Sequence, residues 1–168
     1  VPSTIFDKTR HGKLRDLTAN LQYFFLRGQK IQTPDLGRFY KRNGYKGKIQ
    51  ADDLCAWIEI NEEITAAARI SPLNDETTTR QLRGLWVHKA HRRQALGTLL
   101  LRSINHHATD NKYDLYLLAY PHLGLFYRMN NYQPLSQQET PDSLLTKQQH
   151  YGAKGIPTIA MRLIMEGR

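Results

Sequence analysis

Two neighbouring runs of alternating apolar residues limit most strongly what this chain can fold into. Apolar residues recur at every second position along Leu54–Ile60, and Ile64–Ile70 repeats the alternation after the polar turn Asn61-Glu62-Glu63. A period of two is typical of strands with one buried face, and a short polar connection joins two such strands in antiparallel pairing. The two runs therefore predict a β-hairpin, and the fold must contain a sheet.

The segments around this hairpin alternate between strand and helix patterns. The helical spacing of Leu14, Leu17 and Leu21 favours a helix over His11–Arg27, although the piece Leu21–Leu26 is also rich in strand-forming residues. Further strands are predicted at Thr4–Phe6, in the run ending at Leu85-Trp86-Val87, at Leu115–Tyr120 and at Thr158–Ile164. Further helices are predicted from a Thr33 cap and Pro34 to Asn43-Gly44, from Leu96 to Ala108, over Leu123–Asn130 and from Thr140-Pro141 to Gly152.

This order predicts a mixed α/β fold of the α+β type, with helices flanking the sheet. The strand–helix–strand unit Leu82–Tyr120 is expected to form a right-handed parallel crossover. We find no repeat, low-complexity tract or linker, so residues 1–168 are predicted to form a single domain.

Composition places the chain among ordinary globular proteins and leaves its partner open. A single cysteine, Cys55, excludes an internal disulfide and favours the reducing cytoplasm. No apolar run is long enough to span a bilayer, and no charged-then-apolar leader opens the sequence. The net charge of +9 suggests an anionic partner such as nucleic acid, phospholipid or a polyphosphate cofactor, but the basic residues are spread along the chain. Charge alone therefore does not choose among these partners.

The segment from Leu85 to Thr98 has the features of an anion-binding site. It runs from a strand end through a basic turn into an amphipathic helix, whose start offers free backbone N–H groups and a positive dipole end. The small residues Ala95 and Gly97 would let the backbone approach a pyrophosphate closely, and Arg92 and Arg93 would attract it.

Arg92-Arg93-Gln94-Ala95-Leu96-Gly97 resembles the pyrophosphate signature of the GNAT superfamily of acyl-coenzyme A-dependent N-acetyltransferases, with Ala95 where glycine is usual. The resemblance implies a mostly antiparallel central sheet with splayed parallel strands, ending at Val87 and Tyr120, that form an acyl-coenzyme A cleft. It also implies that acetyl-coenzyme A is the co-substrate. The implied cofactor-binding residues are Leu85, Trp86, Val87, Arg92, Arg93, Gln94, Ala95, Leu96, Gly97, Thr98, Tyr120 and Phe126.

A second segment, Phe126–Tyr132, resembles the family's aromatic signature near the C-terminal end. Asn131 stands where the family has glycine, and asparagine is the best tolerated substitute in a left-handed conformation. By this resemblance Tyr127 is the general acid that protonates the departing thiolate, and the backbone N–H of Val87 supports the developing oxyanion. The two signatures occur in the family's order, with a strand between them.

The resemblance implies direct attack of a primary amine on the thioester in a ternary complex, but the base and the acceptor stay open. Many family members carry an acidic residue on the middle strand, whereas Leu82–His88 contains none. Glu59, His88, His122 and a water chain are candidates for the base. A small molecule or a peptide would supply the amine, with an acceptor that bears a carboxylate or phosphate favoured. A homodimer is left open.

Other interpretations carry less weight. The histidines His88, His91, His106 and His107 lack metal-ligand spacing, so no metal is expected, and Cys55 is expected to be a packing residue rather than a nucleophile. The high charge and the aromatic residues within Phe39–Lys46 leave a nucleic-acid-binding module as an alternative. A catalytically silent acyl-coenzyme A sensor is the other alternative, because the expected carboxylate is missing. No association with a membrane is expected.

Overall fold

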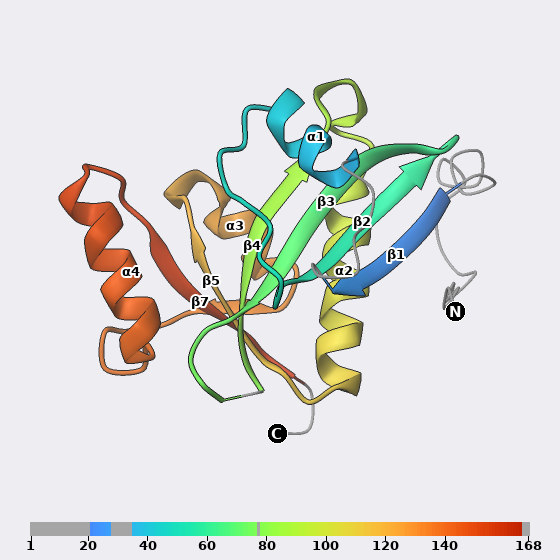
Figure 1. Cartoon of the computed structure of the whole chain (residues 1–168). Helices are drawn as coiled ribbons and strands as arrows, with labels where there is room; N and C mark the ends of the chain where they lie inside the picture. The colour runs from blue at the N-terminus through green and yellow to red at the C-terminus, as the bar shows by residue number, and fades with distance from the viewer. Residues whose placement is uncertain (1–20, 28–34, 77, 166–168) are drawn as a thin grey trace. The chain divides into compact units, whose positions relative to one another are not determined.

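A computed structural model describes residues 21–27, 35–76 and 78–165, and its strands form one sheet in the order β1-β2-β3-β4-β5-β7-β6 (Figure 1). Strands β4 and β5 pair in parallel, whereas β1 pairs with β2, and β7 with both β5 and β6, in antiparallel. The predicted mixed α/β fold with a mostly antiparallel sheet and flanking helices is confirmed. The strands are β1 (Leu21–Arg27), β2 (Leu54–Ile60), β3 (Glu63–Pro72), β4 (Thr79–Val87), β5 (Asp114–Ala119), β6 (Tyr132–Pro134) and β7 (Ile159–Leu163).

Helices α1 (Asp35–Arg42), α2 (Leu96–Asp110), α3 (Gly124–Arg128) and α4 (Asp142–Ala153) alternate with these strands, as the periodicity predicts. Two 3₁₀ turns, η3 (Lys89–His91) and η4 (Pro121–Leu123), follow β4 and β5. Among the described residues, no helix is both long and apolar enough to cross a bilayer. The strand expected at Thr4–Phe6 lies outside the described residues.

The chain divides into two compact units, whose boundaries fall within β3, β4 and α2. The first contains β1, α1, β2, β3 as far as Arg69, and the stretch from Gly84 to Leu100. The second contains the remainder of β3 and β4, α2 from Leu101, and everything that follows. The extent of one domain over residues 1–168 stays a prediction.

The predicted hairpin forms the centre of the first unit. Its first strand has the predicted bounds, and the turn consists of Asn61 and Glu62, with φ of 52° and 65°. Positive φ at both central residues is the geometry of a type I′ turn, which matches the twist of the two strands that it joins. The turn therefore brings Glu59 on β2 and Glu63 on β3 to the same end of the hairpin.

The predicted helix over His11–Arg27 is wrong in its last part, because Leu21–Arg27 forms strand β1. This strand pairs antiparallel with β2 from Leu21 opposite Ile60 to Arg27 opposite Leu54. The aromatic run Tyr23-Phe24-Phe25 is compatible with a strand, and the edge of β2 offers backbone partners that an isolated helix would not use. Residues 11–20 of the predicted helix lie outside the described part.

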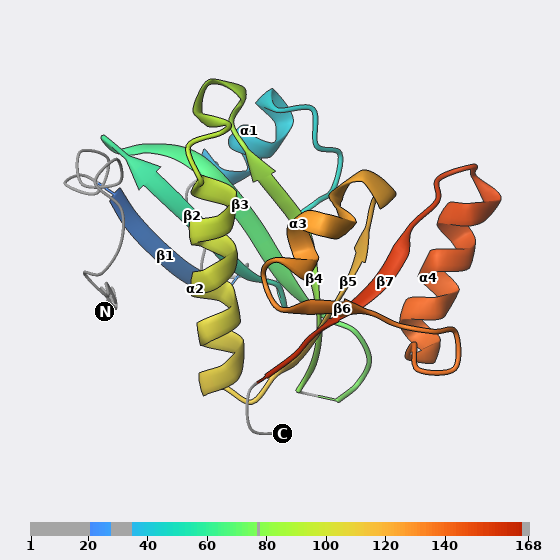
Figure 2. The same cartoon turned by 180° about the vertical axis from the view of Figure 1, so that it is seen from behind.

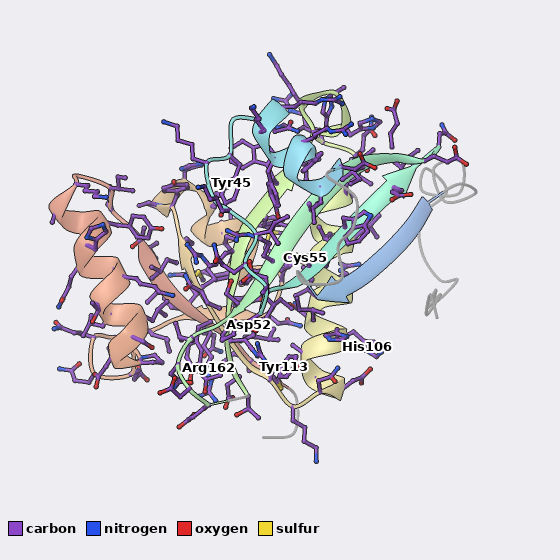
Figure 3. All side chains as sticks on the ribbon, in the orientation of Figure 1. Tyr45, Asp52, Cys55, His106, Tyr113 and Arg162 are labelled. Atoms are coloured by element: carbon purple, nitrogen blue, oxygen red, sulfur yellow. The ribbon has the colours of Figure 1, made fainter. Side chains whose placement is uncertain are left out.

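Helix α1 packs its apolar face on the strands of the first unit. Leu36, Phe39 and Tyr40 are buried against Cys55 and Trp57 of β2 in one hydrophobic cluster. The cluster is completed by Ala67 of β3, and Cys55 is labelled at its place on β2 in Figure 3. Gly44, at φ +76°, follows the helix and supplies the predicted C-terminal stop. The expected cap Thr33 and first-turn Pro34 lie outside the described residues.

A buried ion pair between Arg69 and Asp53 was not expected from the sequence. The Nη1 atom of Arg69 donates to Oδ2 of Asp53 at 2.9 Å, and both side chains are 1% exposed. The backbone N–H of Gln50 donates to the same carboxylate oxygen at 2.8 Å. Arg69 also donates to the carbonyl of Lys48 and, at 2.8 Å, to the hydroxyl of Tyr45. This network fixes the long connection between α1 and β2 on the sheet.

The second unit holds the parallel strand pair. Strands β4 and β5 pair in parallel from Thr79 opposite Asp114 to Gln81 opposite Tyr116, as the predicted strand–helix–strand unit requires. Strand β5 is buried along both faces, which explains its almost continuous apolar sequence. Figure 2 shows β6 and β7 of this unit side by side, joined in register from Tyr132 opposite Leu163.

Candidate functional site

The basic turn after β4 has a defined conformation in the first unit. The backbone N–H of His88 donates to the carbonyl of Thr65 at 2.8 Å, which joins the end of β4 to the start of β3. Nε of Arg92 donates to the carbonyl of Val87 at 3.2 Å, and its guanidinium lies 5.9 Å from the centre of the Trp86 ring. Arg92 is thus turned back onto the strand end, while Arg93 is exposed without such a contact.

Two residues of this turn adopt a left-handed backbone conformation. Arg93 has φ 64° and Ala95 has φ 61°, immediately before α2 begins at Leu96. The first helical hydrogen bond runs from the N–H of Leu99 to the carbonyl of Ala95 at 2.9 Å. The N–H groups of the first helical turn therefore have no intrahelical acceptor, and with the helix dipole they offer donors that would suit an anion. The conformation of Ala95 explains why glycine is usual at this position of the signature.

Replacing Ala95 by glycine should stabilise the protein. A residue with a Cβ is strained by about 1–2 kcal/mol in the left-handed region, and glycine relieves this strain. Glycine also increases the conformational entropy of the unfolded chain, which offsets part of the stabilisation. We expect a rise of about 0.5–1 kcal/mol in the free energy of unfolding, measured by urea denaturation. Ala90→Gly is the matched control in η3, where φ is not positive, and it should lower stability. Equal losses from both substitutions would contradict this account of Ala95.

The strand that precedes the turn is held by an aromatic cluster. Gly84 interrupts β4 with φ +59°, and its carbonyl accepts a hydrogen bond of 2.9 Å from the hydroxyl of Tyr40. A Cβ at Gly84 would lie 3.0 Å from the ring of Tyr45. The centre of that ring is 6.0 Å from the centre of the Trp86 ring. These contacts hold the backbone of Leu85-Trp86-Val87, which the resemblance assigns to cofactor binding.

The second signature is ordered by hydrogen bonds within the second unit. Asn131 has φ 69°, so asparagine fills the left-handed position where the family has glycine, as predicted. Asn105 of α2 donates to the carbonyl of Asn130 at 3.0 Å and accepts from the hydroxyl of Tyr132 at 2.8 Å. The helix that carries Tyr127 is therefore tied to α2 by side chains that the motif alone does not reveal.

Tyr127 lies in an apolar setting in this unit. It is 8% exposed, and its ring meets Phe126 at 5.1 Å and Tyr132 at 5.8 Å, both edge to face. Burial raises the pKa of Tyr127 to about 12, so the phenol keeps its proton at neutral pH. Tyr120, in contrast, is 51% exposed and stacks on His122.

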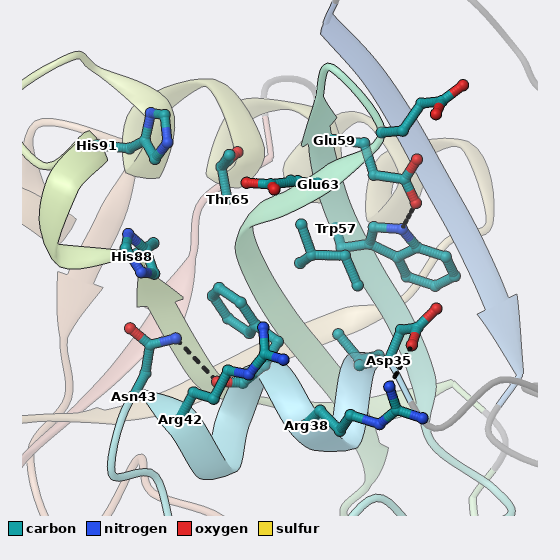
Figure 4. A pocket seen from close by; sticks show the side chains of 14 residues that line it. Asp35, Arg38, Arg42, Asn43, Trp57, Glu59, Glu63, Thr65, His88 and His91 are labelled. Atoms are coloured by element: carbon teal, nitrogen blue, oxygen red, sulfur yellow. Dashed lines mark hydrogen bonds and ion pairs between the residues drawn. The ribbon is translucent and has the colours of Figure 1, made fainter.

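A pocket of about 370 Å³ opens in the first unit between α1, the β2–β3 hairpin and the turn after β4 (Figure 4). Its floor includes the apolar side chains of Phe39, Trp57 and Ile64. Its polar lining comprises Asp35, Arg38, Arg42, Asn43, Glu59, Glu62, Glu63, Thr65, His88 and His91. The volume falls within the range typical of small-molecule sites.

The three side chains that are candidate bases fall in different units. Glu59 and His88 both line this pocket, whereas His122 belongs to the second unit. Of the predicted cofactor and catalytic residues, Leu85–Val87 and Arg92–Thr98 lie in the first unit, and Tyr120, Phe126 and Tyr127 lie in the second. Sequence reasoning missed Glu62 and Glu63 at this pocket. The predicted hairpin turn was the available signal, since it sends both residues to the end of the sheet where β4 stops.

The remaining candidates from the sequence are the histidines and Cys55. The rings of His88 and His91 are 5.9 Å apart, and within the described ranges no group of three or more histidine, cysteine, aspartate or glutamate side chains is placed to hold a metal. Cys55 is fully buried, and burial together with Asp53 raises the pKa of its thiol to about 12. A thiol that stays protonated fits the predicted packing role.

Comparisons with known proteins agree with the fold and with the family resemblance. Residues 52–134 match the sequence model of an acetyltransferase (GNAT) domain. Escherichia coli ElaA and an acyl-CoA N-acyltransferase from Pseudomonas aeruginosa each superpose with a TM-score of 0.64, at 18% and 15% identity, over 86% of this chain and 99% of theirs. No curated protein matches the chain.

A third structure extends the comparison to a larger enzyme. N-acetylglutamate synthase from Neisseria gonorrhoeae, complexed with coenzyme A and N-acetyl-glutamate, superposes with a TM-score of 0.62 at 17% identity, over 88% of this chain and 36% of that one. Likenesses at these identities establish the fold. Residues 52–134 match the GNAT family of acetyltransferase domains, as the two signatures predict.

Proposed function

We propose that the chain transfers an acetyl group from acetyl-coenzyme A to a primary amine by direct attack within a ternary complex. The observation that carries this proposal is the turn Arg92–Ala95, whose two left-handed residues lead into N–H groups without an intrahelical acceptor at the start of α2. That arrangement fits a pyrophosphate, since backbone donors and a helix dipole converge without a competing acid in the first turn. The proposed location is the cytoplasm, where the thiol of Cys55 would stay reduced.

Separate residues would bind the cofactor and assist the attack of the amine. Arg92 is already bonded to Val87, so it would shape the loop, and exposed Arg93 with the N–H groups of Leu96, Gly97 and Thr98 would hold the phosphates. Coenzyme A supplies the acyl group as an activated thioester. The backbone N–H of Val87 would donate to the carbonyl oxygen as negative charge develops there, while Glu59 or His88, directly or through water, would take the amine's proton.

The departing sulfur needs a proton once the carbon–sulfur bond breaks. We assign this proton to Tyr127, whose phenol is neutral at physiological pH because burial raises its pKa. The amine nitrogen gains the acyl carbon and loses a proton to the base, and the thiolate gains a proton from the phenol. Each transferred acyl group thus leaves one free thiol, which provides the readout for activity.

Calorimetric titration of acetyl-coenzyme A tests the cofactor site directly. We expect micromolar binding by the parent protein and at least about tenfold weaker binding by Gly97→Glu, because the new carboxylate crowds and repels the pyrophosphate. Gly37→Glu is the matched control, since it adds the same charge on the exposed face of α1 where nothing lies within 4 Å of an added Cβ. Circular dichroism checks that all three proteins are folded.

Each outcome of the titration separates the candidate functions. Binding that Gly97→Glu loses and Gly37→Glu keeps supports the cofactor site, and thiol release with an amine panel then distinguishes an enzyme from a silent acyl-coenzyme A sensor. Absence of binding by the parent at high cofactor concentration would refute the proposal. Binding of RNA and DNA across a salt series would then be measured, since electrostatic nucleic-acid binding weakens steeply with salt.

A further inference from the structure

The pocket of the first unit carries opposite charges on facing sides. Helix α1 supplies Arg38 and Arg42, one helical turn apart, and the β2–β3 hairpin supplies Glu59, Glu62 and Glu63. Figure 4 shows the two arginines along the helix and the carboxylates of Glu59 and Glu63 along the hairpin opposite them. A pocket with a single sign of charge would suit a polycation or a polyanion, and this one suits neither.

The charged side chains of the pocket differ in the ion pairs and hydrogen bonds that they already form. Arg38 lies 3.6 Å from Asp35 in an exposed pair on its own helix. One oxygen of Glu59 accepts a hydrogen bond of 2.9 Å from Nε1 of Trp57, whose ring is buried, so this carboxylate is held in position. Arg42, Glu62 and Glu63, in contrast, have no ion-pair partner among the residues that the structure describes. Arg42 on one side, and the two glutamates on the other, are therefore free to bind a ligand.

The carboxylate side lies next to the end of β4. The hydrogen bond from the N–H of His88 to the carbonyl of Thr65 places the residue after Val87 beside β3, two residues along from Glu63. Thr65 is buried and lines the pocket between them. An ammonium group bound at Glu63 would thus lie on the strand that pairs with the end of β4, where the proposed reaction needs the amine.

From this arrangement we infer that the acceptor is a small dipolar amine of the amino-acid type, with its amine toward Glu59 and Glu63 and its carboxylate toward Arg42. This inference rests on the proposed function and adds the acceptor class to it. An arginine can hold a carboxylate through two parallel hydrogen bonds, which gives orientation as well as affinity. A simple diamine would place a second cation against Arg42, and a carboxamide would offer that arginine no charge.

The test compares the common α-amino acids with their own carboxamides, and with cadaverine as a diamine. Release of free thiol from acetyl-coenzyme A gives kcat/KM, and ligand-observed NMR gives binding without the cofactor. We expect at least one amino acid to exceed its carboxamide by about tenfold or more in kcat/KM. Arg42→Ala should remove most of this preference, whereas Glu63→Gln should weaken both members of each pair, because both carry the amine.

Two control variants change similar charges outside the pocket. Lys41→Ala removes a cation from the same helix, and Asp52→Asn removes an exposed anion from the loop before β2. Neither residue lines the pocket, and both variants should keep the preference of the parent protein.

The outcomes separate this inference from the proposed function. Equal turnover of amino acids, carboxamides and cadaverine by a protein that binds acetyl-coenzyme A would overturn the acceptor class and leave the cofactor site intact. Failure of every amino acid to bind in the NMR experiment would also overturn it. Loss of acetyl-coenzyme A binding alone would refute the proposed function, while amino-acid binding that Arg42→Ala abolishes would still support the pocket's assignment.

Discussion

Asp53→Ala should lower the free energy of unfolding by about 3–5 kcal/mol, because it leaves the guanidinium of Arg69 buried without its counter-ion. Both side chains are 1% exposed, and the carboxylate also accepts the N–H of Gln50 at 2.8 Å. The hydroxyl of Tyr45 and the carbonyl of Lys48 would remain as partners of Arg69, but neither carries a compensating charge. Urea denaturation of the parent and the variant measures the difference.

Asp52→Ala is the control, since Asp52 is the exposed neighbour on the same loop, labelled in Figure 3. Its effect should stay within about 0.5 kcal/mol. The double variant Asp53→Leu with Arg69→Met removes both charges, and it should be more stable than Asp53→Ala alone. A loss below about 1 kcal/mol for Asp53→Ala would show that water reaches Arg69 and that the pair is not buried in solution.

The sequence predicts the elements whose signals are local. The hairpin is set by alternation and by a turn that two residues with positive φ complete, and the bounds of β2 follow from these alone. Helix α2 and strand β5 likewise follow from the periodicity and the run of apolar residues that each contains. Strands β1 and β6 are exceptions, because each depends on pairing with a strand that is distant in sequence, β1 with β2 and β6 with β7.

The candidate site was predictable in its cofactor half and not in its acceptor half. The loop Arg92–Gly97 is one continuous segment, so its pattern resembles that of a known family and its conformation follows from the residues present. The pocket joins α1, the hairpin and the turn after β4, and its charge pattern exists only once these three segments meet. Helix α1 contributes Arg38 and Arg42 to this pocket, and the hairpin supplies the acidic lining from elsewhere in the chain.

Tyr127→Phe should reduce kcat by about a hundredfold or more while leaving acetyl-coenzyme A affinity nearly unchanged, since the phenol acts on the departing sulfur and its ring stays in place. The ring keeps its edge-to-face contacts with Phe126 and Tyr132 in the variant, so the fold should be preserved. Tyr113→Phe is the matched control, because this partly exposed ring packs near Arg80 and His107 and has no assigned part in the reaction. Calorimetry and thiol release on both variants separate binding from turnover.

The pH profile tests the same assignment by an independent route. A phenol of pKa about 12 is a weaker acid than an ordinary thiol, whose pKa is about 8.5, so it would protonate a solvated thiolate poorly. Burial acts on thiols in the same direction, however, and it raises the pKa of Cys55 to about 12. A thiolate released in surroundings as dry as those of Tyr127 would likewise gain proton affinity, because burial disfavours its charged form. Deprotonation of Tyr127 should then cause no decrease in the kcat/KM of the parent protein below about pH 10. A decrease near pH 8 that is absent in Tyr127→Phe would contradict a buried general acid.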